Sequence, residues 1–274
     1  MKLAEFKKAF SKRLSILVAT TKFTYQIETA FRTNNWANVL STCFYTLSQI
    51  LFINVLYVNV KLIAGYSKDE MLLFMFIGQV GYYISWLFHA NLLELIQDVN
   101  KGTLDTLLIK PVPSLFYITF KKIRLFSVVR DCLPPLIVLG LFINWSKLSL
   151  SPTSFLAGFI ITLLGITCAH IVHLLSALPV FWLGESESIL NLSQEFEYNI
   201  GKVIPFEGFG NNFKLVFTTI VPVMISAGVA TSVILMKLPI FPTLIWVVII
   251  TILALIVRQW IWKFALRTYT SASS

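Results

Sequence analysis

Long apolar runs without charged residues recur along this chain and predict helices that cross a membrane. The hydrocarbon core of a bilayer is about 30 Å thick, so a spanning helix needs about 20 mostly apolar residues. The windows that satisfy this requirement are residues 36–60, 71–90, a stretch between 124 and 145, 155–182, 214–237 and 237–258. Backbone polar groups find no water inside lipid, which favours helices over isolated strands. The runs also lack the alternation of a β-barrel, so we expect an all-α membrane protein with six transmembrane helices.

The composition excludes an ordinary water-soluble domain. Hydrophobic residues make up 57% of the 274 positions and charged residues only 13%. Soluble domains usually carry about a quarter charged residues. The mean hydropathy of +0.78 agrees with the apolar windows.

The distribution of the net charge of +9 predicts the orientation of the chain. Lys and Arg concentrate before the first span, between spans two and three, and after span six. The connections between spans one and two, three and four, and five and six hold only four basic residues, which are Lys61, Lys68, Lys147 and Lys237. We expect the protein in the inner membrane of the cell. The positive-inside rule then places both termini in the cytoplasm. Membrane topology accounts for the excess of basic residues, so no nucleic-acid partner is expected.

Residues 1–32 precede the first span and predict an amphipathic helix. Its apolar residues are three or four positions apart, while lysines occupy the opposite side; the apolar set is Leu3, Phe6, Phe10, Leu14 and Leu17, and the lysines are Lys8 and Lys12. Such a helix lies on the inner leaflet and contacts membrane lipid. It can serve as a topology anchor or take part in coupling. The first apolar run begins too late for a cleavable signal peptide.

Few side chains in the predicted spans have functional chemistry. The three cysteines, Cys43, Cys132 and Cys168, lie in separate spans without a CxxC pair, so we expect no metal or redox site. His170 and His173 share one face of the fourth span, an i, i+3 pair that could bind a metal ion or a proton, although we expect them to pack between helices or to line a pathway. No carboxylate lies near them in the sequence.

Arg130 and Asp131 lie about one turn inside the inner end of the third span. Adjacent residues on a helix face different directions, so we expect these two side chains not to pair with each other. An interhelical partner or snorkelling would make either charge tolerable. Structural anchoring and lining of a translocation pathway are both consistent with this position.

The chain lacks the motifs of common catalytic sites. There is no GxxxxGK[ST] phosphate loop, and the single Gly-Lys pair, at Gly201, is followed by Val203. Without that loop the chain cannot hydrolyse ATP by the P-loop route. We therefore expect a protein that is not an enzyme, with no cofactor of its own.

The segment 92–113, between spans two and three, is amphipathic. Leu92, Leu95 and Ile96 recur at helical spacing, while the polar side holds Glu94, Asp98 and Lys101. Gly102 ends this helix, and a second short apolar face follows before two prolines; it comprises Leu104, Leu107 and Leu108, followed by Pro111 and Pro113. A short knob of mixed polarity suits insertion into a cleft of another protein. The alternative is a loop on the lipid surface.

Four local motifs, taken in order, resemble one family. Residues 99–111, around Gly102-Thr-Leu104-Asp105, resemble the I-x-x-G-x-L-D-x-x-L-x-[RK]-P signature of type-2 ABC export permeases with six spans in a separate chain. The loop 64–67 resembles their A-G-[WY]-S turn, and residues 266–272 resemble their closing L-R-x-Y-x-S-A stretch. Ile220-Val221-Pro222 stands where that branch has V-I-P, at the start of the predicted fifth span. Lys110 departs slightly from the commoner Arg.

This resemblance implies a function for the whole chain. Residues 33–274 would form the permease subunit of an ATP-driven exporter, together with a second permease chain and a separate ABC ATPase that binds ATP and Mg. The segment 92–113 would be the cytoplasmic coupling helix; the residues assigned to it are Glu94, Asp98, Gly102, Leu104, Asp105, Leu107 and Pro111. A secondary transporter or channel not driven by ATP is the alternative, although the sequence shows no internal repeat.

Residues 184–212 are polar and acidic, and they interrupt the apolar pattern before the predicted fifth span. We expect this segment on the cytoplasmic side, either as a plain loop or as a re-entrant piece that dips between helices. A re-entrant piece is acceptable where protein or a cavity satisfies its backbone.

Overall fold

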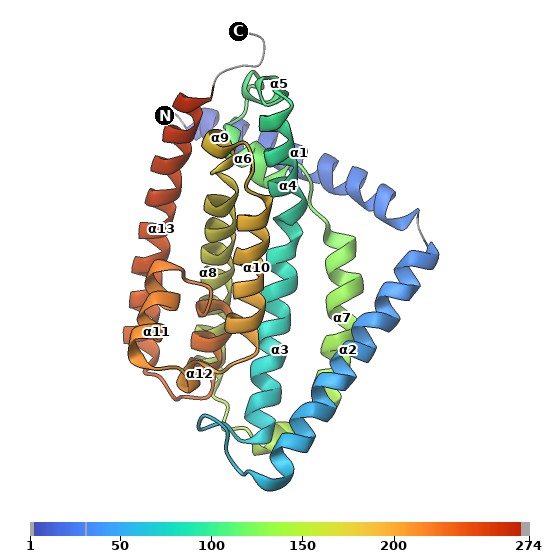
Figure 1. The fold of residues 1–274 in the computed structure, drawn as a ribbon, viewed down its shortest axis with the longest axis vertical. Coiled ribbons are helices and arrows are strands. Elements are labelled where there is room, and N and C mark those ends of the chain that lie inside the picture. The colour runs from blue at the N-terminus through green and yellow to red at the C-terminus, as the bar shows by residue number, and fades with distance from the viewer. Residues whose placement is uncertain (1–2, 31, 270–274) are drawn as a thin grey trace.

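The computed structural model describes residues 3–30 and 32–269, and this part of the chain is helical apart from connecting loops (Figure 1). Its α-helices are α1 (Leu3–Thr29), α2 (Arg32–Asn59), α3 (Lys68–Ser85), α4 (His89–Asn100), α5 (Asp105–Leu108), α6 (Ser114–Phe120), α7 (Leu125–Phe142), α8 (Pro152–Ala177), α9 (Val180–Leu183), α10 (Glu187–Lys202), α11 (Asn211–Leu215), α12 (Ala230–Ile234) and α13 (Ile240–Thr268). The predicted all-α fold is confirmed.

Among the described residues, five helical stretches are long and apolar enough to cross a membrane. They are Thr33–Asn59, Lys68–Asn100, Leu125–Phe142, Pro152–Leu183 and Ile240–Thr268. The second stretch is longer than the predicted window, because α3 continues through a 3₁₀ turn, Trp86–Phe88, directly into α4. These stretches correspond to five of the six predicted spans.

The surface of the helix bundle is strongly apolar. In the most apolar windows of α2 and α13, only 17% of residues are buried inside the structure. Trp36 on α2 is 70% exposed, and Phe241 on α13 is 77% exposed. Large contiguous apolar surfaces of this kind require lipid or another protein rather than water.

Two helices begin with reciprocal side-chain caps. The Ser67 hydroxyl accepts a hydrogen bond from the Glu70 backbone N–H, and the Glu70 carboxylate accepts one from the Ser67 N–H. At the start of α8, Ser151 and Ser154 form the same reciprocal arrangement, with Pro152 in the first turn. These caps satisfy backbone N–H groups that have no partner inside the helix.

The predicted fifth span differs from the structure. Residues Asn211–Ile220 and Ile225–Ile234 form two limbs that are bent by 106° relative to each other. Both ends of this hairpin lie at the loop between α2 and α3: a Cβ at Gly208 would lie 3.3 Å from the Ala64 Cβ, and Lys237 donates a hydrogen bond to the Gly65 carbonyl. The hairpin therefore enters the bundle and returns at the same end. Pro222 lies in the bend.

The position of the segment 184–212 also differs from the prediction, which placed it at the cytoplasmic end of the molecule. Helix α10 starts beside the end of α8, where Ser186 Oγ donates to the Ala177 carbonyl at 2.6 Å. It then runs alongside α8 and α3 (Figure 1) to the opposite end, where Gly208 lies near Ala64. The polar segment 184–212 thus runs the length of the bundle, a place that the prediction gave to the apolar window 214–237. The apolar 214–237 window forms the hairpin instead.

Helix α8 lies at the centre of the bundle, and its glycines allow the returning limb of the hairpin to approach closely. A Cβ at Gly165 would lie 2.4 Å from the Ser226 backbone nitrogen, and one at Gly158 would lie 2.2 Å from the Ile234 side chain. Residues 222–235 of this limb are buried throughout. Gly81 and Gly228 also mark close approaches within the chain, because a Cβ at Gly81 would lie 3.3 Å from the Ser226 side chain and one at Gly228 3.3 Å from the Phe206 Cβ.

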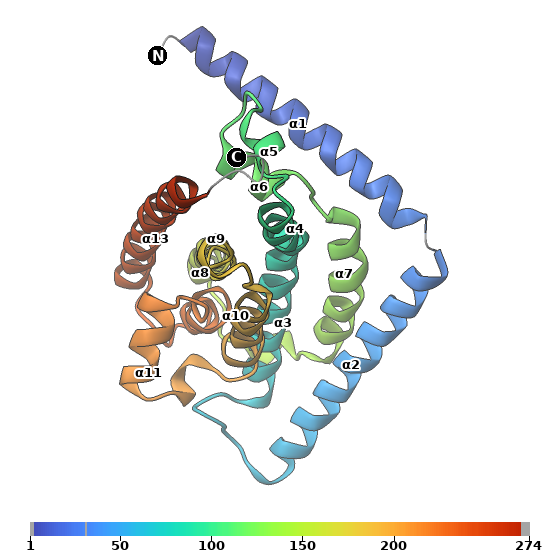
Figure 2. The ribbon, with the colours of Figure 1, turned by 45° about the horizontal axis from the view of Figure 1, so that its top comes forward.

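Helix α1 lies across one end of the bundle, outside the other helices (Figure 2). Its contacts with the rest of the chain include aromatic packing, an ion pair and hydrogen bonds. Tyr25 packs edge-on against Phe126 at 5.6 Å, and Arg13 lies over the Phe116 ring. Glu28 pairs with Arg124 at 2.9 Å, which ties the end of α1 to the start of α7.

We predict that Gly165→Ala destabilises the protein by about 1–3 kcal/mol, the usual cost of overpacking. The added methyl would meet backbone atoms of Ser226, which cannot rotate away. Thermal unfolding of the purified chain in lipid nanodiscs measures the effect. Gly210→Ala is the matched control, because no atom lies within 4 Å of a Cβ there. Equal melting temperatures for the two variants would contradict the close approach.

We also predict that cysteines replacing Lys68 and Gly210 are labelled from the same side of the membrane, and that one replacing Lys101 is labelled from the other. The three native cysteines are first replaced. An impermeant maleimide applied to intact and permeabilised cells separates the two sides. Labelling of Gly210→Cys from the same side as the cysteine at position 101 would instead support the sequence-based prediction, which places 184–212 on the cytoplasmic side.

Candidate functional site: the 92–113 segment and the adjoining helix interior

The 92–113 segment folds into a compact knob at one end of the bundle, with α5 at its tip (Figure 1). Helix α4 ends where Gly102 adopts a left-handed conformation, with φ of +69°, which glycine tolerates best. The Thr103 and Leu104 backbone N–H groups then donate to the Asp98 carbonyl. The chain reverses here and continues through α5 and α6 toward α7.

A buried asparagine fastens the knob to the rest of the molecule. Asn91 is fully buried, and its amide nitrogen donates to the Thr119 and Lys122 carbonyls at 2.8 Å each. Its Oδ1 accepts a hydrogen bond from the Lys122 N–H at 3.0 Å. One side chain therefore satisfies three backbone groups where α6 ends, outside any helical ladder. The sequence analysis missed this residue.

Glu94 and Asp98 form ion pairs within the chain. Lys121 lies 3.0 Å from Glu94 and 2.9 Å from Asp98, and Lys122 also pairs with Glu94. The polar side of α4 thus faces the end of α6. Asp98 additionally accepts a hydrogen bond from the Thr103 hydroxyl.

The other residues assigned to the 92–113 segment occupy different environments. Leu104 is fully buried in an apolar cluster with Leu92 and Trp262, and Leu107 packs against this cluster. Asp105 begins α5, and Pro111 is exposed. The most exposed apolar side chain of the tip is Ile109, at 83%, which the sequence analysis did not single out.

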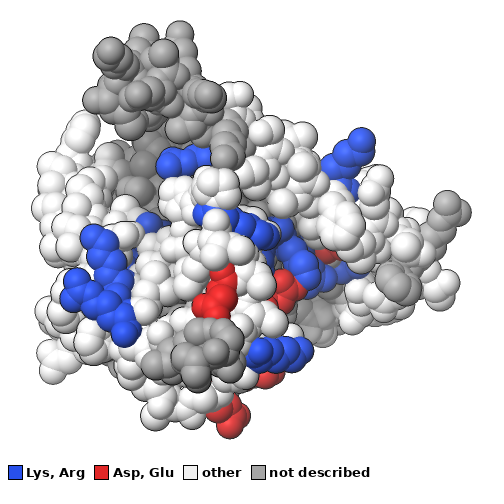
Figure 3. All heavy atoms as spheres, turned by 90° about the horizontal axis from the view of Figure 1, so that it is seen from above, with Lys and Arg blue, Asp and Glu red and all other residues white. Residues whose placement is uncertain are grey.

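Lys and Arg side chains gather on the end of the bundle that carries the knob, with smaller acidic patches between them (Figure 3). The knob therefore presents an exposed apolar residue in a mainly basic surrounding. This combination of an apolar anchor with charged neighbours suits a protein surface of complementary charge.

Arg130 and Asp131 pair with each other, contrary to the prediction. Arg130 Nε and Nη2 each lie 2.6 Å from a carboxylate oxygen of Asp131. The Cα–Cβ bonds of neighbouring helix residues point in different directions, but the arginine side chain is long enough to reach the Asp131 carboxylate. Nη1 donates to Asn35 Oδ1 of α2, so the pair also joins α7 to α2.

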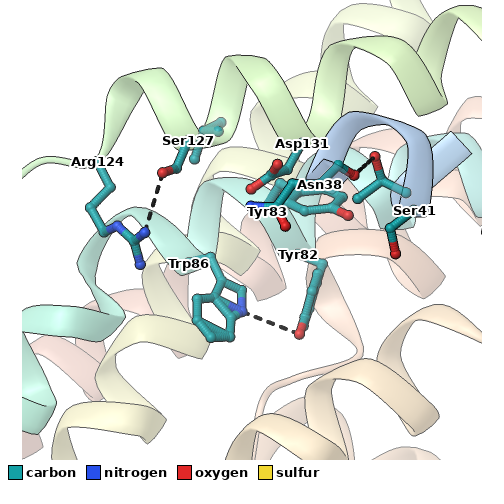
Figure 4. Close-up of a pocket in the computed structure, with 10 residues that line it drawn as sticks. Asn38, Ser41, Tyr82, Tyr83, Trp86, Arg124, Ser127 and Asp131 are labelled. Atoms are coloured by element: carbon teal, nitrogen blue, oxygen red, sulfur yellow. Dashed lines mark hydrogen bonds between the residues drawn. The ribbon is translucent and has the colours of Figure 1, made fainter. Parts of the chain in front are cut away.

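A cavity of about 320 Å³ lies beside this pair, between α2, α3 and α7 (Figure 4). Its walls combine aromatic rings with hydroxyl, amide and charged groups; they comprise Asn38, Ser41, Thr42, Tyr82, Tyr83, Trp86, Arg124, Ser127, Val128 and Asp131. The Trp86 indole donates to the Tyr82 hydroxyl, and Arg124 donates to Ser127. Rings beside hydrogen-bonding groups can hold an amphiphilic molecule.

His170 and His173 are both buried, and His173 contacts a carboxylate from a distant part of the sequence. His173 Nε2 lies 2.7 Å from Glu197 Oε2 of α10. His170 packs against Phe88, with ring centroids 5.1 Å apart. Because α10 was not expected to enter the bundle, the sequence analysis placed no carboxylate near these histidines.

Pro222 does not lie near the histidines or the Arg130–Asp131 pair. It lines a separate, mainly apolar hollow between the hairpin, α8 and α13. Within the described residues, no group of three or more His, Cys, Asp or Glu side chains is arranged to hold a metal ion.

Together these features define a multi-pass α-helical membrane protein with a tightly held knob at its basic end. A family model described as ABC-2 family transporter protein matches residues 43–273. The chain therefore belongs to this family and is the permease component of an ABC transporter. No curated protein and no solved structure matches the chain.

We predict that Asn91→Ala loosens the attachment of the knob. Loss of the side chain leaves three backbone groups without a protein partner, each at a cost of about 1–3 kcal/mol where water cannot replace it. Hydrogen–deuterium exchange should show faster exchange of the Lys122 amide. Asn100→Ala, at an exposed position of the same helix, is the control and should exchange as wild type. Unchanged protection in Asn91→Ala would refute the role of this residue.

Proposed function

We propose that the chain is the permease subunit of an ATP-driven exporter and couples to a separate ABC ATPase through the 92–113 segment. The observation that carries this proposal is the shape and attachment of the knob. It projects at one end of the bundle, is fixed by Asn91 and the lysine pairs, and presents Ile109 to a partner.

The geometry supports transfer of motion from the knob into the bundle. Helix α4 continues into α3 through one 3₁₀ turn, while α6 leads into α7 after Arg124. A force applied to the knob therefore acts on both helices that line the cavity of Figure 4. Such movement would change access to this cavity, which we propose to be part of the pathway for an amphiphilic substrate.

The energy source in this proposal is the partner. The chain has no phosphate loop, so ATP and Mg would bind to the ATPase subunit. A second permease chain, identical or paralogous, would complete the pathway, as the resemblance to six-span export permeases implies. The exposed apolar helices α2 and α13 leave surface for that chain and for lipid.

The proposed location is the inner membrane, with both termini in the cytoplasm. Helix α1 and the end of α13 lie at the knob end, where Lys and Arg gather (Figures 1 and 3). The positive-inside rule assigns such an end to the cytoplasm. Helix α1, which lies across this end, would then rest at the inner leaflet with its apolar residues toward lipid.

We predict that Ile109→Glu uncouples transport from ATP hydrolysis. A carboxylate replaces the apolar anchor at an exposed position, so the fold should persist while binding to the ATPase weakens by about tenfold or more. The measurements are co-purification of the ATPase and ATP-dependent substrate efflux from vesicles. Leu62→Glu is the matched control, because Leu62 is also exposed but lies in the loop at the opposite end.

Two results would contradict the proposal. Normal co-purification and efflux in Ile109→Glu would remove the tip of the knob from the docking surface. Efflux that persists without any ATPase subunit would favour a secondary transporter or channel.

A further inference from the structure

A hollow of about 230 Å³ at the basic end of the bundle is lined by two arginines and, among the described residues, by no carboxylate. Arg13 comes from α1 and Arg258 from α13, while the other walls come from Gln259, Pro113 and helix α6. Arginine side chains stay charged in proteins, and two like charges beside one hollow repel each other. An anion between them would remove this repulsion.

Arg258 lies where a positive charge needs a partner. It is the first charged residue of α13, at the end of the apolar run that begins at Ile240. Its Nε is buried and has no hydrogen-bond acceptor among the described residues. A cation beside the apolar part of a membrane helix is costly unless an opposite charge compensates it. The described walls of the hollow contain no Asp or Glu, so a bound anion would supply this charge.

Arg13 brings a second guanidinium group to the same hollow from a different helix. Its guanidinium carbon lies 5.5 Å from the centroid of the Phe116 ring on α6. This contact places the cation at the hollow but supplies no oxygen acceptor for its N–H donors. The planar guanidinium group matches the geometry of phosphate oxygens and binds them through paired hydrogen bonds. Two such groups on opposite walls therefore suit a phosphate.

We propose that this hollow binds the phosphate group of an anionic phospholipid of the inner leaflet, between Arg13 and Arg258. The proposal rests on the proposed orientation, in which the basic end of the bundle faces the cytoplasm. Anionic lipids are concentrated in the cytoplasmic leaflet, and basic pockets between helices on that side bind their headgroups. A zwitterionic lipid suits the hollow less well, because its ammonium group adds a further positive charge.

The surface next to the hollow favours a lipid over a free phosphate ion. Gln259 is exposed and lines the hollow, so it lies where the hollow meets the outer surface of α13. Ile256 and Ile252 precede it at helical spacing on the same side of α13, toward the membrane interior. They are 60% and 51% exposed. Acyl chains attached to the bound phosphate would cover this apolar surface, which a free phosphate would leave uncovered.

A lipid in this position would join three elements of the basic end. Its phosphate would contact α1 and α13, and the hollow that holds it is walled by α6. The other half of α1 is attached to α7 by the Tyr25–Phe126 and Glu28–Arg124 contacts. The bound lipid would thus attach the first half of α1 to the bundle.

The test measures lipid binding to the full-length chain, purified in a neutral detergent, by native mass spectrometry. Short-chain phosphatidylglycerol, short-chain phosphatidylcholine and inorganic phosphate are titrated separately. We expect phosphatidylglycerol to bind at least about tenfold more tightly than the other two, since it alone offers both net negative charge and acyl chains. The assay needs neither ATPase nor transport, so its result is independent of docking at Ile109.

Arg258→Gln and Arg13→Gln should each weaken phosphatidylglycerol binding by about tenfold or more, because each removes charged hydrogen-bond donors. Arg267→Gln is the matched control, since Arg267 is exposed on α13 but does not line the hollow. It should bind the lipid as the wild type does. Two variants on separate helices guard against failure of one of them to fold.

Three results would overturn the proposal. Wild-type affinity in either folded variant would remove that arginine from the site. Equal weakening in Arg267→Gln would show general attraction to a basic surface instead of a defined site. Displacement of phosphatidylglycerol by an equal concentration of inorganic phosphate would assign the hollow to a soluble phosphate and exclude the lipid as its occupant.

Discussion

The constraint that shapes this protein is that backbone polar groups inside a membrane must be satisfied by protein. The hairpin 211–234 meets this constraint in an unusual way, because its two limbs are joined by a bend that no continuous helical ladder can cross. Bonds within the bend satisfy several groups: the Val221 N–H donates to the Val216 carbonyl, and the Met224 N–H donates to the Phe217 carbonyl. The returning limb is then shielded from lipid by burial against α8.

Burial of that limb depends on the absence of side chains at two positions of α8. Gly158 and Gly165 allow backbone and side chains of the hairpin into space that a methyl group would fill. Because the hairpin takes this place without reaching the opposite end, another segment has to connect the two ends of the bundle. Helix α10 does so; its Ser193 and Glu197 are buried against His173 of α8, while Glu187, Asn191 and Glu195 are exposed. The buried His173–Glu197 contact is a product of this arrangement.

Much of the fold was predictable from the sequence, since five long apolar windows correspond to five helical stretches. Length and hydropathy identify such helices directly. The prediction for the fifth window was wrong because its apolar residues are buried inside the protein. A segment buried in protein and a segment exposed to lipid have similar apolar compositions, so hydropathy does not separate them. Helix α10 was missed for the opposite reason: Glu187, Glu195 and Glu197 lower its hydropathy, although Glu197 is buried with a partner.

The candidate site was predictable in outline but not in its contacts. The spacing in 92–113 indicated a helix that stops at Gly102 and a second short apolar face after it; in the structure α4 ends just before Gly102, and the short helix α5 follows. What spacing could not show is that Glu94 and Asp98 meet lysines more than twenty positions away, or that Asn91 binds backbone groups about thirty positions away. Arg130 shows a further limit of prediction from helical spacing. Helix geometry separates the Cβ atoms of adjacent residues, but the arginine side chain is long enough to pair with Asp131.

These long-range polar contacts share one physical role. Asn91 and the Glu94–Lys121 pair join α4 to α6, and the Glu28–Arg124 pair joins α1 to α7, in addition to the apolar contacts between these helices. The knob and α1 lie at the end of the bundle, where lipid no longer holds helices together and water competes for hydrogen bonds. Directional polar contacts can fix an orientation there that apolar packing alone would leave free. The interior of the bundle is held by apolar packing, whereas at its basic end an apolar cluster is combined with charge pairs and hydrogen bonds that set the orientation of the knob.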